Sequence, residues 1–346
     1  MANRIVAGFL TLFISVSTMA AEKGLFFDHN DWELACDNTR TCRAAGYAAE
    51  EGVGSVLLTR LAGPNAVIRG EIMKLEPESD TALTVPQPSL WIDGLFVGNL
   101  RQKGKGEDYW LLTPKQASAI AHAIKGNGKV EFKGGSSTFL LSGKGAYAIF
   151  LKMDEFQGRI GTPGALTRVG DKPEAGVKAA LPVPVIRKAR VIKSESRNLT
   201  EQELTRLLPA LTASLSAEEN CDVGPSNDPA DGEAAPISLQ QLDSRHSLLS
   251  VLCWRAAYNE GYGFWLIDHQ LQKKPQLITA SGSIYEDGEI FMSQKGRGPG
   301  DCWGIENWVW DGKIFRKSEQ KTTGRCNSLI LGGTWDLPTL VSEVKH

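Results

Sequence analysis

The chain has 346 residues, of which 42% are hydrophobic, 23% charged and 8% aromatic. These proportions exclude a disordered or low-complexity chain, and the length allows about two domains, each with its own core. The formal net charge of −2 excludes the basic surface that nucleic-acid binding needs, so we expect no nucleic-acid partner.

Residues 1–20 have the pattern of a signal peptide. A short basic start ends at Arg4, an apolar run covers 5–16, and small residues precede the expected cleavage after Ala20. The apolar run is shorter than the roughly 20 residues that span a bilayer, so we expect no stable membrane insertion. The sequence therefore predicts an exported protein.

Residues 21–160 are predicted to form an N-terminal β domain with one helix. The strand candidates are short apolar segments at 66–73, 90–92, 109–112, 129–132 and 146–153. A helix is expected after Thr113, an N-cap residue type, because Pro114 suits the first helical position, and Gly126 can end it. Its apolar face would consist of Ala117, Ile120, Ala121 and Ile124.

Glycine and proline residues interrupt the periodicity at 161–185, which predicts a linker. The C-terminal domain, 186–346, then begins with a helix, because Thr200 and Glu203 have the spacing of a capping box. A leucine stripe follows at helical spacing and is more typical of a core face than of a partner site. The stripe consists of Leu204, Leu207, Leu208, Leu211 and Leu215.

The rest of the second half is predicted to be β structure. A polar loop at 222–236 precedes strands expected at 246–254, 262–267, 276–280 and 288–293, with hairpin turns at 286–288 and 311–312. The two halves together predict a mainly β, α+β fold of two β-sandwich-like or antiparallel β domains, stabilised by disulfides.

Six cysteines are expected to pair, because an exported chain folds in an oxidising compartment. Sequence alone allows 15 pairings. The smallest loops favour Cys36 with Cys42, Cys221 with Cys253, and Cys302 with Cys326. The chain contains no C-x-x-C pair and no closely spaced histidines, so neither a metal nor another cofactor is expected.

The sequence contains no assembled catalytic motif, and no catalytic residue is predicted. The G-x-S-x-G elbow is absent, and the Ser318-x-x-Lys321 pair is short enough to occur by chance. The spaced glycines at 296–300 would need a following helix to bind phosphate. Cys302 follows instead, which favours a disulfide-anchored turn.

Aromatic residues near the C-terminus are the strongest local candidates for a binding site. Trp303, Trp308 and Trp310 lie between two cysteines, with Arg297 and Asp301 close by in the sequence. On an alternating strand Trp308 and Trp310 share one face, and tryptophan and arginine are enriched in binding hot spots. The favoured alternative is that these tryptophans form the core of a small β domain, because large aromatic residues are mostly buried.

Four segments of the chain resemble segments of a known bacterial family. They are Phe26-Phe27-Asp28-His29-x-x-Trp32-x-x-x-Cys36-Asp37-Asn38-x-x-x-Cys42-x-Ala44, Met153-Asp154-Glu155-x-Gln157-Gly158-Arg159-x-Gly161-Thr162, Cys253-x-x-Ala256-Ala257-Tyr258-Asn259 and Arg297-Gly298-x-Gly300-Asp301-Cys302. Together they resemble a family of exported six-cysteine proteins of about this length that carries only a domain-of-unknown-function label. The resemblance implies a disulfide-bonded, periplasmic or secreted protein of a Gram-negative bacterium, and it supplies no activity and no catalytic residues.

The part from Trp32 to Met153 also resembles the invasion-associated locus B family of exported bacterial β proteins. The shared features are a tryptophan before a cysteine, a Leu-Trp-Ile-Asp-Gly strand, a Lys-Val-Glu-Phe strand and a final apolar strand. This resemblance implies a β-sandwich-like first domain and a role at the cell envelope or host interface. The chain departs from that pattern by carrying a whole extra domain.

These observations favour a non-enzymatic envelope protein that binds a protein, peptide or glycan in the periplasm. Two alternatives stay open. The first is a cell-wall hydrolase, which would need Asp or Glu side chains that face each other across a cleft in the fold. The second is an inhibitor of secreted lysozymes, which would need a protruding loop such as Gly296 to Gly300.

Overall fold

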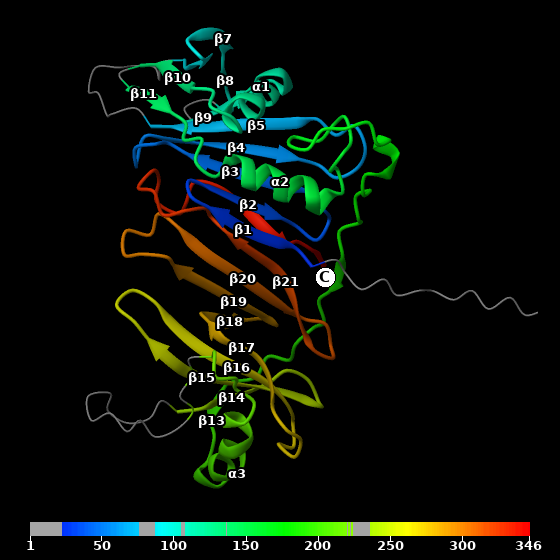
Figure 1. Ribbon diagram of the computed structural model, residues 1–346. Coiled ribbons are helices and arrows are strands. Elements are labelled where there is room, and N and C mark those ends of the chain that lie inside the picture. The colour runs from blue at the N-terminus through cyan, green and yellow to red at the C-terminus, as the bar shows by residue number, and fades with distance from the viewer. Residues whose placement is uncertain are drawn as a thin grey trace, which may run out of the picture.

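The computed structural model describes residues 23–75, 87–104, 108–135, 137–219, 221, 223 and 236–346. The expected signal peptide and most of the expected loop at 222–236 lie outside the described residues. The described chain contains five β-sheets and three α-helices, which confirms the mainly β, α+β fold (Figure 1). Within the described residues no helix is both long enough and apolar enough to cross a bilayer.

The N-terminal half is built on a seven-stranded antiparallel sheet in the order β1-β2-β3-β4-β5-β9-β8. Its strands are β1 (Leu25–His29), β2 (Trp32–Cys36), β3 (Cys42–Tyr47), β4 (Gly54–Arg60), β5 (Ile68–Lys74), β8 (Arg101–Gln102) and β9 (Tyr109–Leu112). Successive side chains of a strand point to opposite faces, and those of β2 are buried on both. Both faces of this sheet are therefore covered.

A second sheet and two helices cover one of these faces. The elements are β6 (Ser89–Ile92), β7 (Leu95–Asn99), β10 (Val130–Gly134), β11 (Ser137–Leu140), α1 (Pro114–Ile124) and α2 (Ala146–Gln157). The four strands run in the order β11-β10-β6-β7. Trp32 and Leu58 from the first sheet, Phe132 from the second and Ile149 from α2 belong to one core.

Helix α1 forms where the sequence predicts it. Thr113 accepts a hydrogen bond from the backbone nitrogen of Gln116, whose side chain in turn accepts one from the Thr113 backbone, and Pro114 occupies the first turn. The four predicted apolar residues are all buried. The opposite side of α1 is left facing outward.

The segment 146–153 was predicted to be a strand, and this prediction is wrong. It belongs to α2, which lies between Gly145 and Gly158, both with positive φ. Ile149, Phe150 and Met153 follow the helical spacing and face the core. A short apolar run alone does not distinguish a buried strand from a buried helix.

The stretch 161–185 has little regular structure, as its glycines and prolines predict, but it is not a free tether. Ala165 and Val177 are buried, and the backbone nitrogen of Lys178 donates to the carbonyl of Gln157 at 3.1 Å. The carbonyl of Lys178 accepts from Gly63 at 2.9 Å. The segment thus lies against the N-terminal half before β12 (Val185–Arg187) begins.

The C-terminal half contains two five-stranded sheets and α3 (Glu201–Thr212), in addition to β23 (Glu343–Lys345), which pairs in parallel with β12. The first sheet consists of β13 (Arg197–Asn198), β14 (Ser238–Gln241), β15 (His246–Arg255), β16 (Glu260–Asp268) and β17 (Gln276–Gly282). The second consists of β18 (Ile284–Glu286), β19 (Glu289–Lys295), β20 (Trp303–Trp310), β21 (Phe315–Thr322) and β22 (Leu337–Leu340). The four predicted strands and both hairpin turns are confirmed.

Helix α3 begins with the predicted capping box, because Thr200 and Glu203 exchange hydrogen bonds between side chain and backbone. Leu207 and Leu211 are buried in a core that the helix shares with β15 and β16, and Leu204 is exposed. The leucine stripe is therefore mainly a core face.

The two halves share a core of their own. Trp335 and Leu337, which lie just before and within β22, pack with Ala45 and Met73 on the second face of the seven-stranded sheet. The Trp335 indole nitrogen donates to the Ser55 hydroxyl at 2.7 Å. The C-terminal chain therefore completes the burial of the N-terminal sheet.

Candidate functional site

Trp308 and Trp310 lie on one face of β20, as predicted, but this face is buried. Their exposed fractions are 5% and 0%. They pack between the two five-stranded sheets with Phe264, Leu266, Ile290 and Phe315. Two packed sheets need large inner side chains to fill the space between them. The prediction of a binding surface is wrong for these two residues, and the alternative core assignment is correct.

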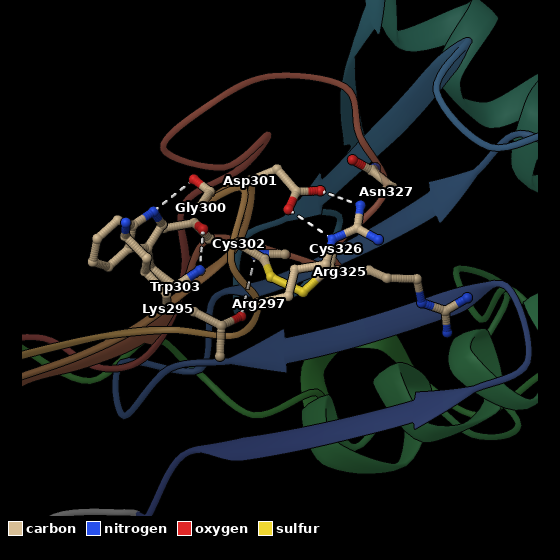
Figure 2. The surroundings of a disulfide bond; sticks show 12 residues. Lys295, Arg297, Gly300, Asp301, Cys302, Trp303, Arg325, Cys326 and Asn327 are labelled. Carbon is tan, nitrogen blue, oxygen red and sulfur yellow. Dashed lines mark hydrogen bonds and ion pairs between the residues drawn. A yellow bond between two sulfur atoms is a disulfide. The ribbon is translucent and has the colours of Figure 1, made fainter. Parts of the chain in front are cut away.

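The other candidate residues, Trp303, Arg297 and Asp301, meet around one of the three disulfides (Figure 2). The disulfides join Cys36 with Cys42, Cys221 with Cys253, and Cys302 with Cys326, which is the pairing that the smallest loops favour. The Cys302–Cys326 bond connects the start of β20 to the chain that follows β21. It therefore fixes the loop at 296–301 to the segment that crosses onto the N-terminal half.

Asp301 is the buried polar centre of this region, with only 2% of its surface exposed. Its carboxylate accepts from Arg297 Nε at 2.8 Å and Nη2 at 2.6 Å, and from the backbone nitrogen of Ser328 at 2.7 Å. Arg297 holds the pKa of Asp301 well below its usual range, so the carboxylate stays charged. Arg297 Nη2 also reaches Glu51 of the N-terminal half at 3.2 Å.

Trp303 is partly buried and shapes the same loop. Its indole nitrogen donates to the Gly300 carbonyl at 2.8 Å, and its backbone nitrogen donates to the Thr323 hydroxyl at 2.9 Å. Lys295 Nζ lies 5.5 Å from the centre of the ring system, within cation–π range. Trp303 therefore acts as a support for the loop.

The turn between β15 and β16 is joined to this loop by Asn259. The Asn259 side-chain nitrogen donates to the Lys295 carbonyl at 2.8 Å, and its side-chain oxygen accepts from the Lys295 backbone nitrogen at 2.9 Å. This pair of bonds fixes the neighbouring Tyr258, which is 47% exposed. A Cβ atom at Gly298 would lie 3.9 Å from the Tyr258 ring.

A third loop, 328–333, lies beside the other two. The Gly332 backbone nitrogen donates to the Gly300 carbonyl at 2.8 Å, while Leu331 at the tip is 75% exposed. We call residues 256–259, 296–301 and 328–333 together the loop platform. Figure 1 shows the three loops on the left edge of the molecule, where the two halves meet.

The loop platform offers contact surface rather than reactive groups. Asp301, Cys302 and Cys326 place possible ligand atoms within 4.8 Å of one another. Both sulfur atoms belong to the disulfide, and the carboxylate is engaged by Arg297 and Ser328, so these atoms are not available to a metal ion. The large exposed apolar side chains of the platform are Tyr258, Ile330 and Leu331, and the partly exposed Arg297 contacts Asp301 and Ser328.

Sequence reasoning missed Tyr258, Asn259 and Leu331 as site residues. The first two belong to one of the segments that resemble the six-cysteine family, and Arg297 with Asp301 belong to another. The signal available in the sequence was that these residues belong to the segments that resemble the family. Leu331 gave none, because the apolar run Leu329-Ile330-Leu331 before two glycines is too short to have a periodic pattern.

A large concavity in the N-terminal half is a separate feature of the molecule, and sequence reasoning also missed it. It is an open groove of about 990 Å³ beside α1. Among the residues that line it, Glu174 is the only carboxylate. The groove therefore lacks the facing pair of carboxylates that the hydrolase alternative requires.

The fold and the site together define a class of protein: stacked antiparallel sheets, fixed by disulfides, that carry a loop platform at their junction. The chain belongs to the family described as protein of unknown function DUF1176, which matches residues 26–342. It is 25% identical over 333 residues to the uncharacterized protein YpfG of Escherichia coli (strain K12), covering 90% of this chain and 91% of that protein. No solved structure matches the chain. The resemblance to a family of unknown function is thereby confirmed.

Proposed function

We propose that this protein is a non-enzymatic interaction module that binds a protein partner of the bacterial envelope through the loop platform. The observation that supports this function is that exposed apolar side chains lie on loops that are held in a fixed conformation. Tyr258 and Leu331 stand out into solvent on loops held by a disulfide, a partly buried ion pair and backbone hydrogen bonds.

Fixed loops are suited to binding because little conformational entropy is lost when a partner docks. An exposed tyrosine with two χ angles can bury a large area at low entropic cost, and both tyrosine and arginine are enriched in binding hot spots. Asp301 already orients Arg297, so its guanidinium is held in place at the edge of the platform.

The proposed compartment is the periplasm or the cell exterior. Three disulfides among six cysteines are typical of chains that fold under oxidising conditions. The signal-peptide pattern at 1–20 supports the same assignment.

The test is affinity purification of the mature protein with periplasmic extract from the bacterium that makes it. Leu331→Asp places a charge at the exposed tip of loop 328–333, and Val183→Asp is the matched control, because Val183 is also an exposed apolar residue but lies outside the platform. We expect one co-purifying protein to be lost with Leu331→Asp and retained with Val183→Asp. Equal recovery with both variants would refute the proposal.

The lysozyme-inhibitor alternative uses the same surface, because the loop at 296–301 is part of the platform. It predicts that an excess of the protein lowers the rate of cell-wall lysis by a secreted lysozyme and that Leu331→Asp restores the rate. If lysis is unchanged, the partner belongs to another class of protein.

A further inference from the structure

The groove beside α1 is a second site, independent of the loop platform. One wall is the outward side of α1, and the other walls are residues 65–68, which lead into β5, and the irregular segment 163–174. The cavity measures about 990 Å³, at the upper end of the range for small-molecule sites, and it is open along its length.

The α1 wall carries a row of polar groups. Lys115, Ser118, His122 and Lys125 all line the groove, and their spacing of three, four and three residues places them along one side of the helix. The two lysines are ten positions apart in the sequence, which corresponds to about 15 Å along a helix. The row therefore places a positive charge near each end and hydrogen-bonding groups between them.

The remaining walls are mainly apolar. Val67 and Val169 line the groove and are 58% and 59% exposed, and Ala165 and Leu166 belong to the same lining. Transfer of this exposed valine surface out of water would contribute favourable free energy. A ligand with an apolar side would recover part of it.

Partly buried hydrogen bonds hold the walls in place. Arg60, which is 5% exposed, donates from Nε to the Ala66 carbonyl at 3.1 Å and from Nη2 to the Gly164 carbonyl at 2.6 Å. Lys125 Nζ donates to the Leu166 carbonyl, which joins the end of α1 to the same segment. The groove is therefore formed before any ligand arrives.

The acidic side chains at this site already have hydrogen-bond donors or arginine side chains as partners. Glu174 accepts from the backbone nitrogens of Gly164 and Asn65 and lies 3.6 Å from Arg159. Asp154, beneath the groove, lies 3.6 Å from Arg60. In the part of the chain that the structure describes, no carboxylate pairs with Lys115, so the α1 wall presents net positive charge.

We infer that the groove binds an extended peptide segment in which acidic and apolar side chains alternate. An extended chain directs successive side chains to opposite faces, which matches one cationic wall and one apolar wall. Its rise of about 3.3 Å per residue places residues i and i+4 about 13 Å apart, close to the spacing of the two lysines. A ligand with a single acidic head would engage only one of them.

The test is calorimetric titration of the mature protein with the peptide acetyl-Glu-Val-Thr-Val-Glu-amide. Its two glutamates and its threonine lie on one face of an extended chain and its two valines on the other. The control peptide acetyl-Glu-Val-Val-Glu-Thr-amide has the same composition and charge without the alternation. We expect the control to bind at least tenfold more weakly, and binding of the first peptide to weaken as salt is added.

Two protein variants locate the binding. Lys115→Glu reverses one exposed charge in the groove, and Lys274→Glu makes the same change on an exposed loop of the C-terminal half. We expect at least a fivefold loss of affinity with Lys115→Glu and no change with Lys274→Glu, with both folds checked by near-UV circular dichroism. Equal binding of the two peptides, no binding, insensitivity to Lys115→Glu, or binding of decanoate in place of the peptide would overturn the inference.

Discussion

The Cys302–Cys326 disulfide is expected to contribute strongly to stability and to hold the loop platform in place. The bond joins residues 24 apart in the sequence. Closing a loop of that size in the unfolded chain corresponds to about 3.4 kcal/mol of stabilisation at 25 °C. The Cys221–Cys253 bond, with a separation of 32 residues, corresponds to about 3.7 kcal/mol, and neither of its cysteines lies next to 296–301 or 328–333 in the chain.

Two double variants separate stability from platform rigidity: Cys302→Ala with Cys326→Ala, and Cys221→Ala with Cys253→Ala. We expect urea unfolding to give a similar loss of free energy, about 3 to 4 kcal/mol, for both. Hydrogen exchange in 296–301 and 328–333 is expected to accelerate only in the first. Unchanged exchange in these loops after removal of Cys302–Cys326 would refute the reasoning that the disulfide fixes the platform.

Three further predictions concern the core and two titrating groups. Trp310→Ala removes a fully buried side chain and should cost about 3 to 5 kcal/mol in urea unfolding; a loss below about 1 kcal/mol would contradict the core assignment. Burial raises the pKa of Glu33, which accepts from Tyr47, so stability should fall as pH rises through that raised pKa. Glu33→Gln should remove this fall, and an unchanged pH profile of urea midpoints would count against it. Hydrogen bonding from Arg197 lowers the pKa of Glu203 to about 2. The contribution of Glu203 to the free energy of unfolding should therefore be complete above the usual glutamate pKa and should be lost as pH falls toward 2. Glu203→Gln should lack that acid-side loss, which circular dichroism of the helical signal between pH 5 and pH 2 can check.

Local signals in the sequence predicted the elements that depend on local chemistry. The capping residues Thr113 and Thr200 marked the starts of two helices, and Asp287-Gly288 marked a hairpin. The strand prediction for 146–153 was wrong because its apolar residues fit a strand as well as a helix over that length. In the structure, the helical spacing of the buried residues Ile149, Phe150 and Met153 and the positive-φ glycines that flank α2 distinguish the two.

The candidate site was only partly predictable because it is made by contacts between distant segments. Arg297 and Asp301 were identified, and they do occupy the platform. Trp308 is buried because the sheet that contains β15 and β16 packs against it. The sequence of β20 alone does not indicate that this second sheet covers the residue. Exposure of Tyr258 and Leu331 likewise depends on three loops that meet at the junction of the two halves.

The most direct test of the interaction-module proposal is site-specific photocrosslinking in living cells of the bacterium that makes the protein. A photoreactive amino acid replaces Leu331 in one strain and Val183 in another, and both proteins are recovered after irradiation. We predict a single crosslinked product of defined size from position 331 that disappears when Tyr258→Ala is added, and none from position 183. No product from position 331, or the same products from both positions, would contradict the assignment of the loop platform as a binding surface.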